Sequence, residues 1–244
     1  MKKILLLLAC ANFAHLTLLA QKTSTDKPRP RVAFGVKFGG TAARLYDGTL
    51  LTAATKSGAE LRNEAAKLLI NPTAGIFLTF HINNHWAFTP ELVLAVGGSA
   101  DKYQLRYQTT SQDVTSLTEL NYLQIPLLAT YTLGKVENKV RPFVNLGITP
   151  AYLLRGTIKQ DVSTTQNSNG AQLSTDSNTN NFTAEKTTKR YDGAGTLGIG
   201  LHLGKAIDLE TRYNLGFLSL SSDPTLLINN AKNQVLSLSI GAKF

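Results

Sequence analysis

Large apolar residues alternate with small or polar residues along most of the chain after residue 31. In the first such segment Val32, Phe34, Val36 and Phe38 are separated by alanine, glycine and lysine. Successive side chains of a β-strand point to opposite faces, so a repeat of two residues predicts a strand with one apolar face.

This alternation recurs in eight segments, each of roughly the ten residues that a tilted strand needs to cross a bilayer. The segments are residues 32–39, 73–82, 86–97, 122–129, 141–152, 192–203, 207–217 and 236–244. An even number of strands lets the chain close with both ends on one side. The pattern therefore predicts an all-β fold, an eight-stranded antiparallel transmembrane β-barrel.

The connections between these segments alternate strictly in length. The long ones are Gly40–Asn71, Gly98–Thr118, Arg155–Tyr191 and Leu218–Gln234, and the short ones are 83–84, 133–139 and 204–205. Membrane barrels have long outer loops and short periplasmic turns, whereas a soluble sandwich has no reason to separate its loops by length. The connections thus favour the membrane barrel independently of the strands.

Two long connections contain segments of distinct composition. Thr164–Asn181 consists almost wholly of serine, threonine, asparagine, glutamine and glycine, so it cannot bury a core and we expect it to be mobile. Glu60–Leu69 has helix-forming residues. It is either a short amphipathic helical turn or an extension of the second strand.

A membrane barrel turns its large apolar side chains outward to lipid and keeps small and polar ones inside. The interior of eight strands is just filled by side chains, so charges there must pair. We expect Glu91 and Glu210 to pair with Arg141, Arg212 or Lys37. The whole predicted polar network of the lumen is Lys37, Glu91, Gln124, Arg141, Asp208, Glu210 and Arg212.

Aromatic residues fall near both ends of the predicted strands. We expect Phe80, Trp86, Phe88, Tyr131 and Phe244 near the periplasmic ends, and Phe38, Tyr152, Tyr213 and Phe217 near the outer ends. Two such girdles are typical of amphipathic rings at lipid interfaces.

The N-terminus has the pattern of a secretory signal peptide. Lys2 and Lys3 precede an apolar stretch that ends at Ala20. The predicted organisation is a signal peptide at 1–20, a flexible leader at 21–31 and the barrel at 32–244. The single cysteine, Cys10, lies in the signal, so the mature chain has no disulfide or thiol chemistry.

No catalytic or metal-binding motif is apparent in the chain, and we predict no enzyme activity and no cofactor. The histidines His81 and His85 flank a predicted turn, where their spacing does not make one helical face. Asp208 and Glu210 could do acid–base chemistry, but structural ion pairs explain them better. The formal charge is +9, yet lysine and arginine are scattered, which argues against nucleic acid as a partner.

Several segments resemble the PorT-like family of outer-membrane β-barrels from Bacteroidetes. They are Thr89–Leu92 followed by Gly97–Gly98, Leu120–Leu128, Glu210–Asn214 and the terminal Leu238–Phe244. The family has an acidic residue where this chain has Gln124. The resemblance implies a barrel in the cell outer membrane, and it implies that Leu238, Ile240 and Phe244 guide insertion by the barrel-assembly machinery.

Three functions remain open from the sequence. The first is a non-enzymatic barrel that acts in surface interaction or envelope maintenance. The second is an accessory component of a protein secretion system, and the third is an outer-membrane enzyme that modifies lipid or peptide. The expected partners are outer-membrane lipid, the barrel-assembly machinery during insertion, and an envelope or secretion protein.

Overall fold

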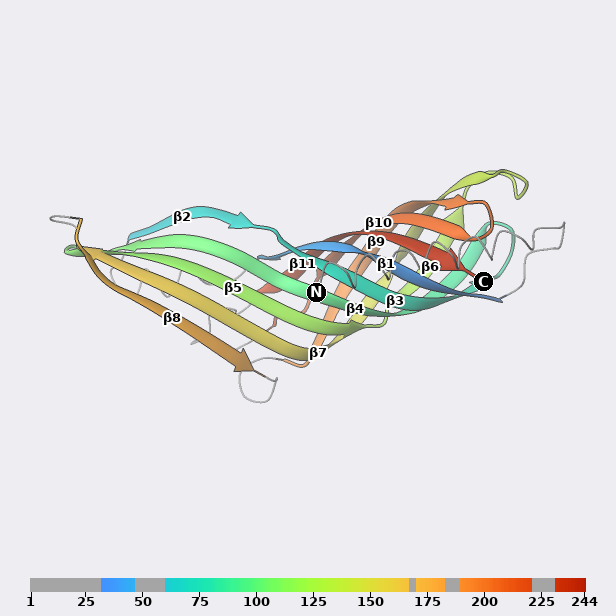
Figure 1. The fold of residues 1–244 in the computed structure, drawn as a ribbon. Coiled ribbons are helices and arrows are strands. Elements are labelled where there is room, and N and C mark those ends of the chain that lie inside the picture. Colours follow the sequence, from blue (N-terminus) through green and yellow to red (C-terminus); the bar gives the residue numbers. More distant parts are fainter. Residues whose placement is uncertain (1–31, 47–59, 167–169, 183–188, 221–230) are drawn as a thin grey trace, which may run out of the picture.

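The computed structural model describes residues 32–46, 60–166, 170–182, 189–220 and 231–244, all arranged in one sheet of eleven strands (Figure 1). The strands are β1 (Val32–Tyr46), β2 (Glu60–Lys67), β3 (Leu69–His81), β4 (Trp86–Arg106), β5 (Thr110–Gln124), β6 (Leu127–Thr132), β7 (Val140–Gln166), β8 (Gln172–Phe182), β9 (Tyr191–Leu203), β10 (Ile207–Gly216) and β11 (Lys232–Lys243). Among the described residues, no helix is long and apolar enough to span a membrane.

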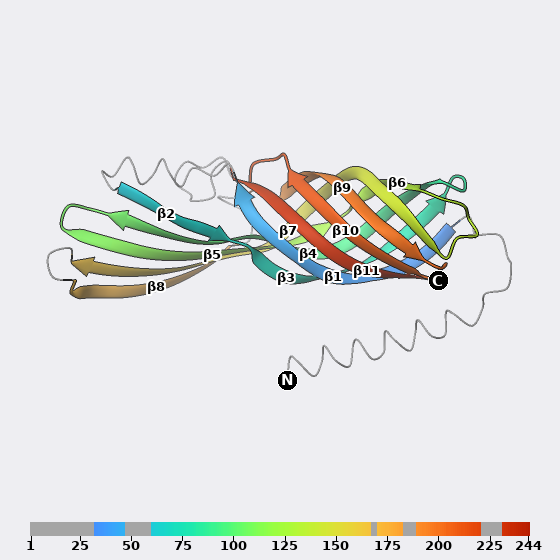
Figure 2. The ribbon, with the colours of Figure 1, turned by 90° about the horizontal axis from the view of Figure 1, so that it is seen from above.

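The sheet closes into a ring of eight antiparallel strands, which confirms the predicted barrel (Figure 2). Around the ring β1 pairs with β3, β3 with β4, β7 with β9, β9 with β10, and β10 with β11, and β11 closes onto β1. Between β4 and β7 the barrel wall is formed by β5 and β6 together. These are two halves of one strand that is interrupted at Ile125 and Pro126.

The large apolar side chains point away from the barrel and the polar ones point into it. Phe34, Ile76, Leu94 and Ile240 are 43%, 44%, 55% and 47% exposed, whereas charged residues such as Arg212 are buried. This distribution is the reverse of a soluble barrel and agrees with the predicted orientation.

Five strands continue beyond the barrel and form an extension that we call the outer sheet (Figure 2). It comprises β2, residues 98–106 of β4, 110–119 of β5, 157–166 of β7, and β8, in the order β2-β4-β5-β7-β8. The loops predicted at Gly98–Thr118 and Arg155–Tyr191 are therefore largely strands. Once the barrel fixes the start of each strand, neighbouring backbone groups continue to pair, and this pairing needs no apolar face.

Two expectations for the loops are resolved by the outer sheet. The segment Thr164–Asn181, predicted as part of a long loop, belongs for the most part to β7 and β8, which pair with each other. The composition of a segment indicates whether its side chains can form an apolar core. A polar segment can still form a strand when its backbone groups pair with a neighbouring strand. Of the two alternatives for Glu60–Leu69, the strand extension holds, since β2 pairs with β4 and β3 begins at Leu69.

Glycines permit the chain to bend at two points that shape the barrel. Gly204 has a φ of +67° in the short turn between β9 and β10. Gly98 has a φ of +118° where β4 enters the outer sheet, and a Cβ there would lie 2.0 Å from the carbonyl oxygen of Thr118. Only glycine fits this conformation and close approach.

The short turns occur at the predicted places, between β3 and β4, between β6 and β7, and between β9 and β10. They lie at the end of the barrel opposite the outer sheet (Figure 1). The predicted signal peptide at 1–20 and the leader at 21–31 lie outside the described residues.

Candidate functional site

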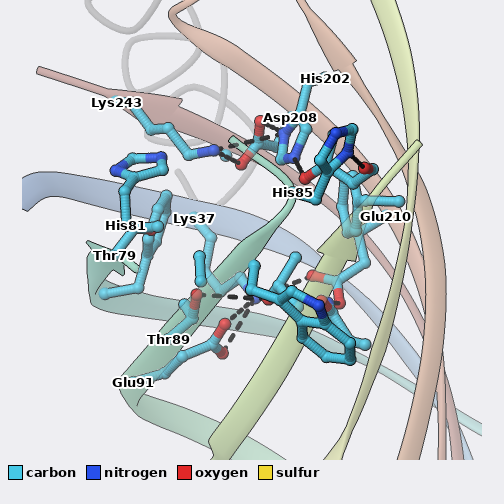
Figure 3. Close-up of a pocket in the computed structure, with 18 of the residues that line it drawn as sticks. Lys37, Thr79, His81, His85, Thr89, Glu91, His202, Asp208, Glu210 and Lys243 are labelled. Carbon is cyan, nitrogen blue, oxygen red and sulfur yellow. Dashed lines mark hydrogen bonds and ion pairs between the residues drawn. The ribbon is translucent and has the colours of Figure 1, made fainter. Parts of the chain in front are cut away.

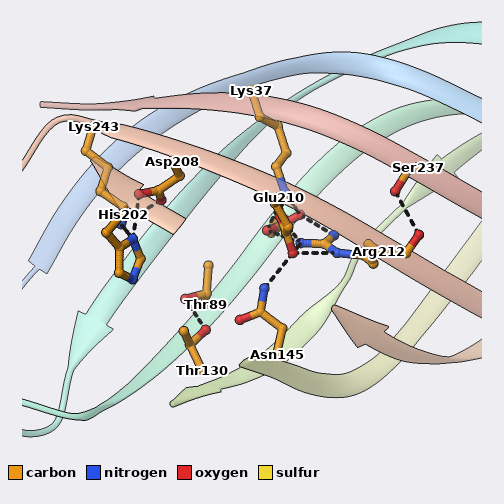
Figure 4. Close-up of polar contacts among 11 residues, drawn as sticks. Lys37, Thr89, Thr130, Asn145, His202, Asp208, Glu210, Arg212, Ser237 and Lys243 are labelled. Atoms are coloured by element: carbon orange, nitrogen blue, oxygen red, sulfur yellow. Dashed lines mark hydrogen bonds and ion pairs between the residues drawn. The ribbon is translucent and has the colours of Figure 1, made fainter. Parts of the chain in front are cut away.

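A network of four buried charges crosses the middle of the barrel lumen (Figure 4). Lys37 comes from β1, Glu91 from β4, and both Glu210 and Arg212 from β10, where residues two apart share the inward face. The network therefore links walls of the barrel that are far apart in sequence. Its two positive and two negative charges balance.

Each carboxylate in this network contacts both cations. Lys37 Nζ donates to Glu91 at 2.9 Å and to Glu210 at 3.1 Å. Arg212 donates to the two Glu91 oxygens at 2.9 and 3.0 Å and to Glu210 at 2.8 Å. Asn145 on β7 adds a hydrogen bond to Glu210 at 2.5 Å. Such multidentate pairing offsets the cost of burying the charges.

A second polar cluster lies nearer the short turns (Figure 3). Asp208 accepts a hydrogen bond from Lys243 Nζ at 2.7 Å, and one of its oxygens lies 2.6 Å from His202 Nδ1. The other ring nitrogen of His202 lies 3.3 Å from the hydroxyl of Thr132. Phe143 stacks on the imidazole with ring centroids 4.3 Å apart, which fixes the ring orientation.

A cavity of about 40 Å³ lies between the two clusters and reaches the short-turn end of the barrel. Residues of both clusters line it, together with His81, Asn84 and His85 from the region of the first turn (Figure 3). This volume is room for a few water molecules only. The cavity is therefore too small for a substrate or a continuous pore.

The other predicted network residues lie elsewhere. Arg141 is fully buried near the short turns, where Nη2 donates to the carbonyl oxygen of Asn84 at 2.8 Å. Gln124 ends β5 on the inward face, in register with Val93 of β4 and Ala151 of β7. The structure thus groups Lys37, Glu91, Glu210 and Arg212 in one site and places Asp208 in another.

Apolar residues close the lumen at its outer end. Leu120, Tyr122 and Leu153 of the barrel wall form a buried cluster with Leu220 and Ala231 from the connection between β10 and β11. The amide of Leu220 donates to the carbonyl oxygen of Ala231 at 2.9 Å, which joins the two described ends of this connection beside the cluster. The lumen is thus filled along its length, from the polar clusters to this apolar closure.

Inward-facing glycines make room for aromatic rings in the lumen. A Cβ on Gly200 would lie 2.4 Å from the ring of Phe143, and one on Gly35 of β1 would lie 2.2 Å from the ring of Phe77. Large rings and glycines therefore face each other across neighbouring strands. This arrangement lets the narrow interior hold aromatic side chains.

Within the described ranges, no group of three histidine, cysteine, aspartate or glutamate side chains is placed to hold a metal ion. Strand alternation places Asn145, His202 and Lys243 on the inward face, but their roles depend on which strands meet across the lumen. The sequence pattern alone does not contain that information.

The outer sheet carries a different surface from the barrel. In register across β4, β5 and β7, Tyr103, Val114 and Val162 form a small apolar strip on one face. Burial and the nearby carboxylate of Asp101 raise the pKa of the Tyr103 phenol. Most other residues of the sheet are polar, and residues 172–179 of β8 are exposed throughout.

Sequence comparison decides the family. Residues 19–222 match the model of the outer membrane protein beta-barrel domain. The chain belongs to this family. Together with the ring of eight strands, this membership places the outer-membrane barrel described here in the cell outer membrane. No curated protein matches its sequence.

Solved outer-membrane structures align with most of this chain at low sequence identity and low TM-score. Ail of Yersinia pestis is 10% identical with a TM-score of 0.38, and the match covers 88% of this chain and 100% of Ail. OprG of Pseudomonas aeruginosa is 13% identical with a TM-score of 0.42 over 87% of this chain and 95% of OprG. Neisserial surface protein A is 14% identical with a TM-score of 0.35 over 86% and 97%.

Proposed function

We propose that this outer-membrane barrel is non-enzymatic and acts in surface interaction through its outer sheet. The observation that carries the proposal is the extension of five strands beyond the membrane-embedded ring. In this sheet β8 pairs with β7 alone among the described strands, so its second edge faces outward with unpaired backbone groups. An ordered polar surface with an open edge suits binding of a partner.

The filled lumen supports this function over transport and over catalysis. Glu210 is held by Lys37 and Arg212, and Asp208 is held by Lys243 and His202. Neither carboxylate has space beside it for a lipid or peptide substrate, because the adjoining cavity holds only a few waters. This arrangement disfavours the lipid- or peptide-modifying enzyme.

The resemblance to PorT-like proteins of Bacteroidetes, with a signal peptide at 1–20, supports a second candidate, an accessory role in protein secretion. One observation favours it. The short turns carry the exposed lysines Lys135, Lys139 and Lys205 against one exposed carboxylate, Glu137, so this periplasmic rim has a net positive charge. Such a rim suits an acidic envelope protein as a partner.

A barrel that keeps β2 but lacks most of the other four strands of the outer sheet tests the primary proposal. Residues 100–117 and 158–180 are each replaced by Asn-Gly, which joins strand ends that are paired in the structure. Cells that carry the full chain, the shortened chain or neither are compared for binding to immobilised proteins and glycans and for leakage of a periplasmic marker. Faster gel migration before boiling than after it checks that the shortened barrel is closed.

Surface interaction predicts that shortening abolishes binding and leaves the envelope intact. Binding that survives shortening would contradict the proposal. Leakage in the deletion strain that the shortened barrel repairs would place the function in the barrel itself, as envelope maintenance. The secretion accessory predicts that the deletion strain loses secreted proteins and that the shortened barrel restores them. It also predicts that a barrel with Lys135, Lys139 and Lys205 changed to glutamine does not restore them.

A further inference from the structure

A groove of about 470 Å³ crosses the lipid-facing surface near the outer end of the barrel. Gly195 of β9 lies in it, and Leu146, Leu197, Leu215 and Phe217 are exposed along its sides. Its lining shares no residue with the lumen cavity or with the outer sheet. None of the sites described above uses it.

The groove exists because a glycine stands where the neighbouring strands carry large side chains. Gly195 is in register with Ile148 of β7 and Leu215 of β10, and both of these point outward. A Cβ added to Gly195 would meet no atom within 4 Å. On a face that contacts hydrocarbon, a hollow with apolar sides gains dispersion contacts when an acyl chain fills it.

Polar and cationic residues stand at one end of the same groove. Lys232 lines it, with its ammonium 5.9 Å from the ring centroid of Tyr46, and the Tyr46 hydroxyl donates to the carbonyl oxygen of Gly216 at 2.5 Å. Arg44 is two residues before Tyr46 on the same face, and its Nε donates to Gln234 at 2.5 Å. Gln234 in turn donates to the hydroxyl of Tyr213, which lines the groove.

The charged side chains at this end of the groove are all positive. The residues that line the groove, all within the described part of the chain, include one lysine and no aspartate or glutamate. Lysine and arginine are the side chains that bind phosphate, and their attraction for it is stronger at a partly desolvated site than in water. Hydrocarbon alone would not require the cations, and a free anion would not require the apolar floor.

We propose that this groove binds a phosphate-bearing lipid of the outer leaflet. One acyl chain lies over Gly195 between Leu197 and Leu215, and the phosphate lies beside Lys232, within reach of Arg44. The inference requires the outer-membrane location and is independent of the surface interaction proposed above.

Native mass spectrometry of the purified barrel tests this site. The protein in a neutral detergent is titrated with phosphatidylglycerol or with diacylglycerol of identical acyl chains, which lacks the phosphate. We expect phosphatidylglycerol to be retained about tenfold more strongly, as one charge-assisted contact would give. Lys232→Gln removes that preference, Lys232→Arg keeps it, and Gly195→Leu lowers retention severalfold by filling the hollow.

Two matched variants control for charge and bulk elsewhere. Lys205→Gln removes an exposed lysine from a short turn, and Gly40→Leu adds the same side chain at another outward glycine, where a Cβ would lie 3.8 Å from its nearest neighbour. Both should retain phosphatidylglycerol as the native protein does. Equal retention of the two lipids, an equal loss in Lys205→Gln, or unchanged retention in Gly195→Leu would overturn the proposal. Gel migration before boiling confirms that each variant is a closed barrel.

Discussion

The four charges at the centre of the lumen stabilise the barrel only as a complete set. Glu91 and Glu210 each contact Lys37 and Arg212, and all four side chains are buried. Removal of one partner leaves uncompensated charge in a site that water does not reach freely. The centre of the lumen is thus filled by side chains whose charges fit only one another.

Removal of the guanidinium should therefore be costly. We expect Arg212→Ala to lower the free energy of unfolding by about 3–5 kcal/mol, because two carboxylates lose their shared donor. Urea unfolding in lipid vesicles, followed by the fluorescence of Trp86, the single tryptophan, measures this. Asp113→Ala, on the exposed outer sheet, should change the value by less than about 1 kcal/mol. A similar loss in both variants would contradict the network.

Two glycines of β9 distinguish the faces of the wall. Gly200 points inward against Phe143, and Gly195 points outward into open space. We expect Gly200→Leu to destabilise the barrel by at least about 1–3 kcal/mol through overpacking, and Gly195→Leu to change its stability by less than about 0.5 kcal/mol. The same unfolding assay measures both. Equal effects would mean that the two faces are wrongly assigned.

Alternation along the chain is enough to predict which residues face inward, but not which of them meet. Lys37 and Glu210 are 173 positions apart, and their contact depends on how far neighbouring strands are shifted around the ring. Arg141, expected among the partners of the glutamates, lies near a short turn and donates to Asn84. The grouping of Asp208 with His202 and Lys243 likewise follows from the register of β9, β10 and β11.

The outer sheet shows why strand ends are harder to predict than strand centres. In the membrane, burial of one face imposes a period of two, and the eight central segments were predicted from it. Beyond Gly98 and Arg155 one face is still buried at Val114, Ser116 and Thr118, but most residues are polar, so the alternation of apolar and polar residues disappears although the backbone stays paired. Thr164–Asn181, predicted as part of a long loop, forms parts of β7 and β8 for this reason.

Pairing with β8 should protect the outer half of β7 from hydrogen exchange. Deletion of residues 170–182 removes the partner of residues 156–165, while β5 still pairs with them from the other side. We expect faster exchange of about every second amide in this half, and unchanged exchange at 140–153. Mass spectrometry of peptides from the two halves measures this. Exchange in the outer half that does not respond to the deletion would contradict the pairing.

The C-terminal strand combines a structural contact with a proposed assembly signal. The amide of Phe244 donates to the carbonyl oxygen of Phe34 at 2.8 Å, and the two rings stack with centroids 6.4 Å apart. Leu238 and Ile240 point outward on the same strand. β11 thus closes the ring and exposes its apolar residues to lipid.

We expect Phe244→Ala to lower the amount of assembled barrel in cells severalfold, because the proposed signal loses its terminal ring. Refolding of the purified variant into vesicles should stay close to native, since one exposed ring contributes little to stability. Gel migration before boiling, in cell extracts and after refolding, separates the two effects. An equal defect in both would assign Phe244 a packing role only.

The molecule as a whole divides into three regions with different surroundings. Lipid meets the exposed leucines, isoleucines and phenylalanines of the ring, the lumen is filled by paired charges, glycines and rings, and the outer sheet is polar. This division, rather than any reactive group, carries the proposal of surface interaction. It also defines where a bound lipid and a bound partner would sit without interfering.

Spin-label accessibility along β9 and into the outer sheet tests this division most directly. Single cysteines are placed at 196–202 and at 159 in residues 21–244, a stretch that has no native cysteine. Labels at 197, 199 and 201 should collide readily with oxygen, which concentrates in lipid, and those at 196, 198, 200 and 202 with neither oxygen nor a water-soluble nickel complex. The label at 159 should collide with the nickel complex. A reversed or absent period of two along β9 would contradict the lipid-facing barrel and everything inferred from it.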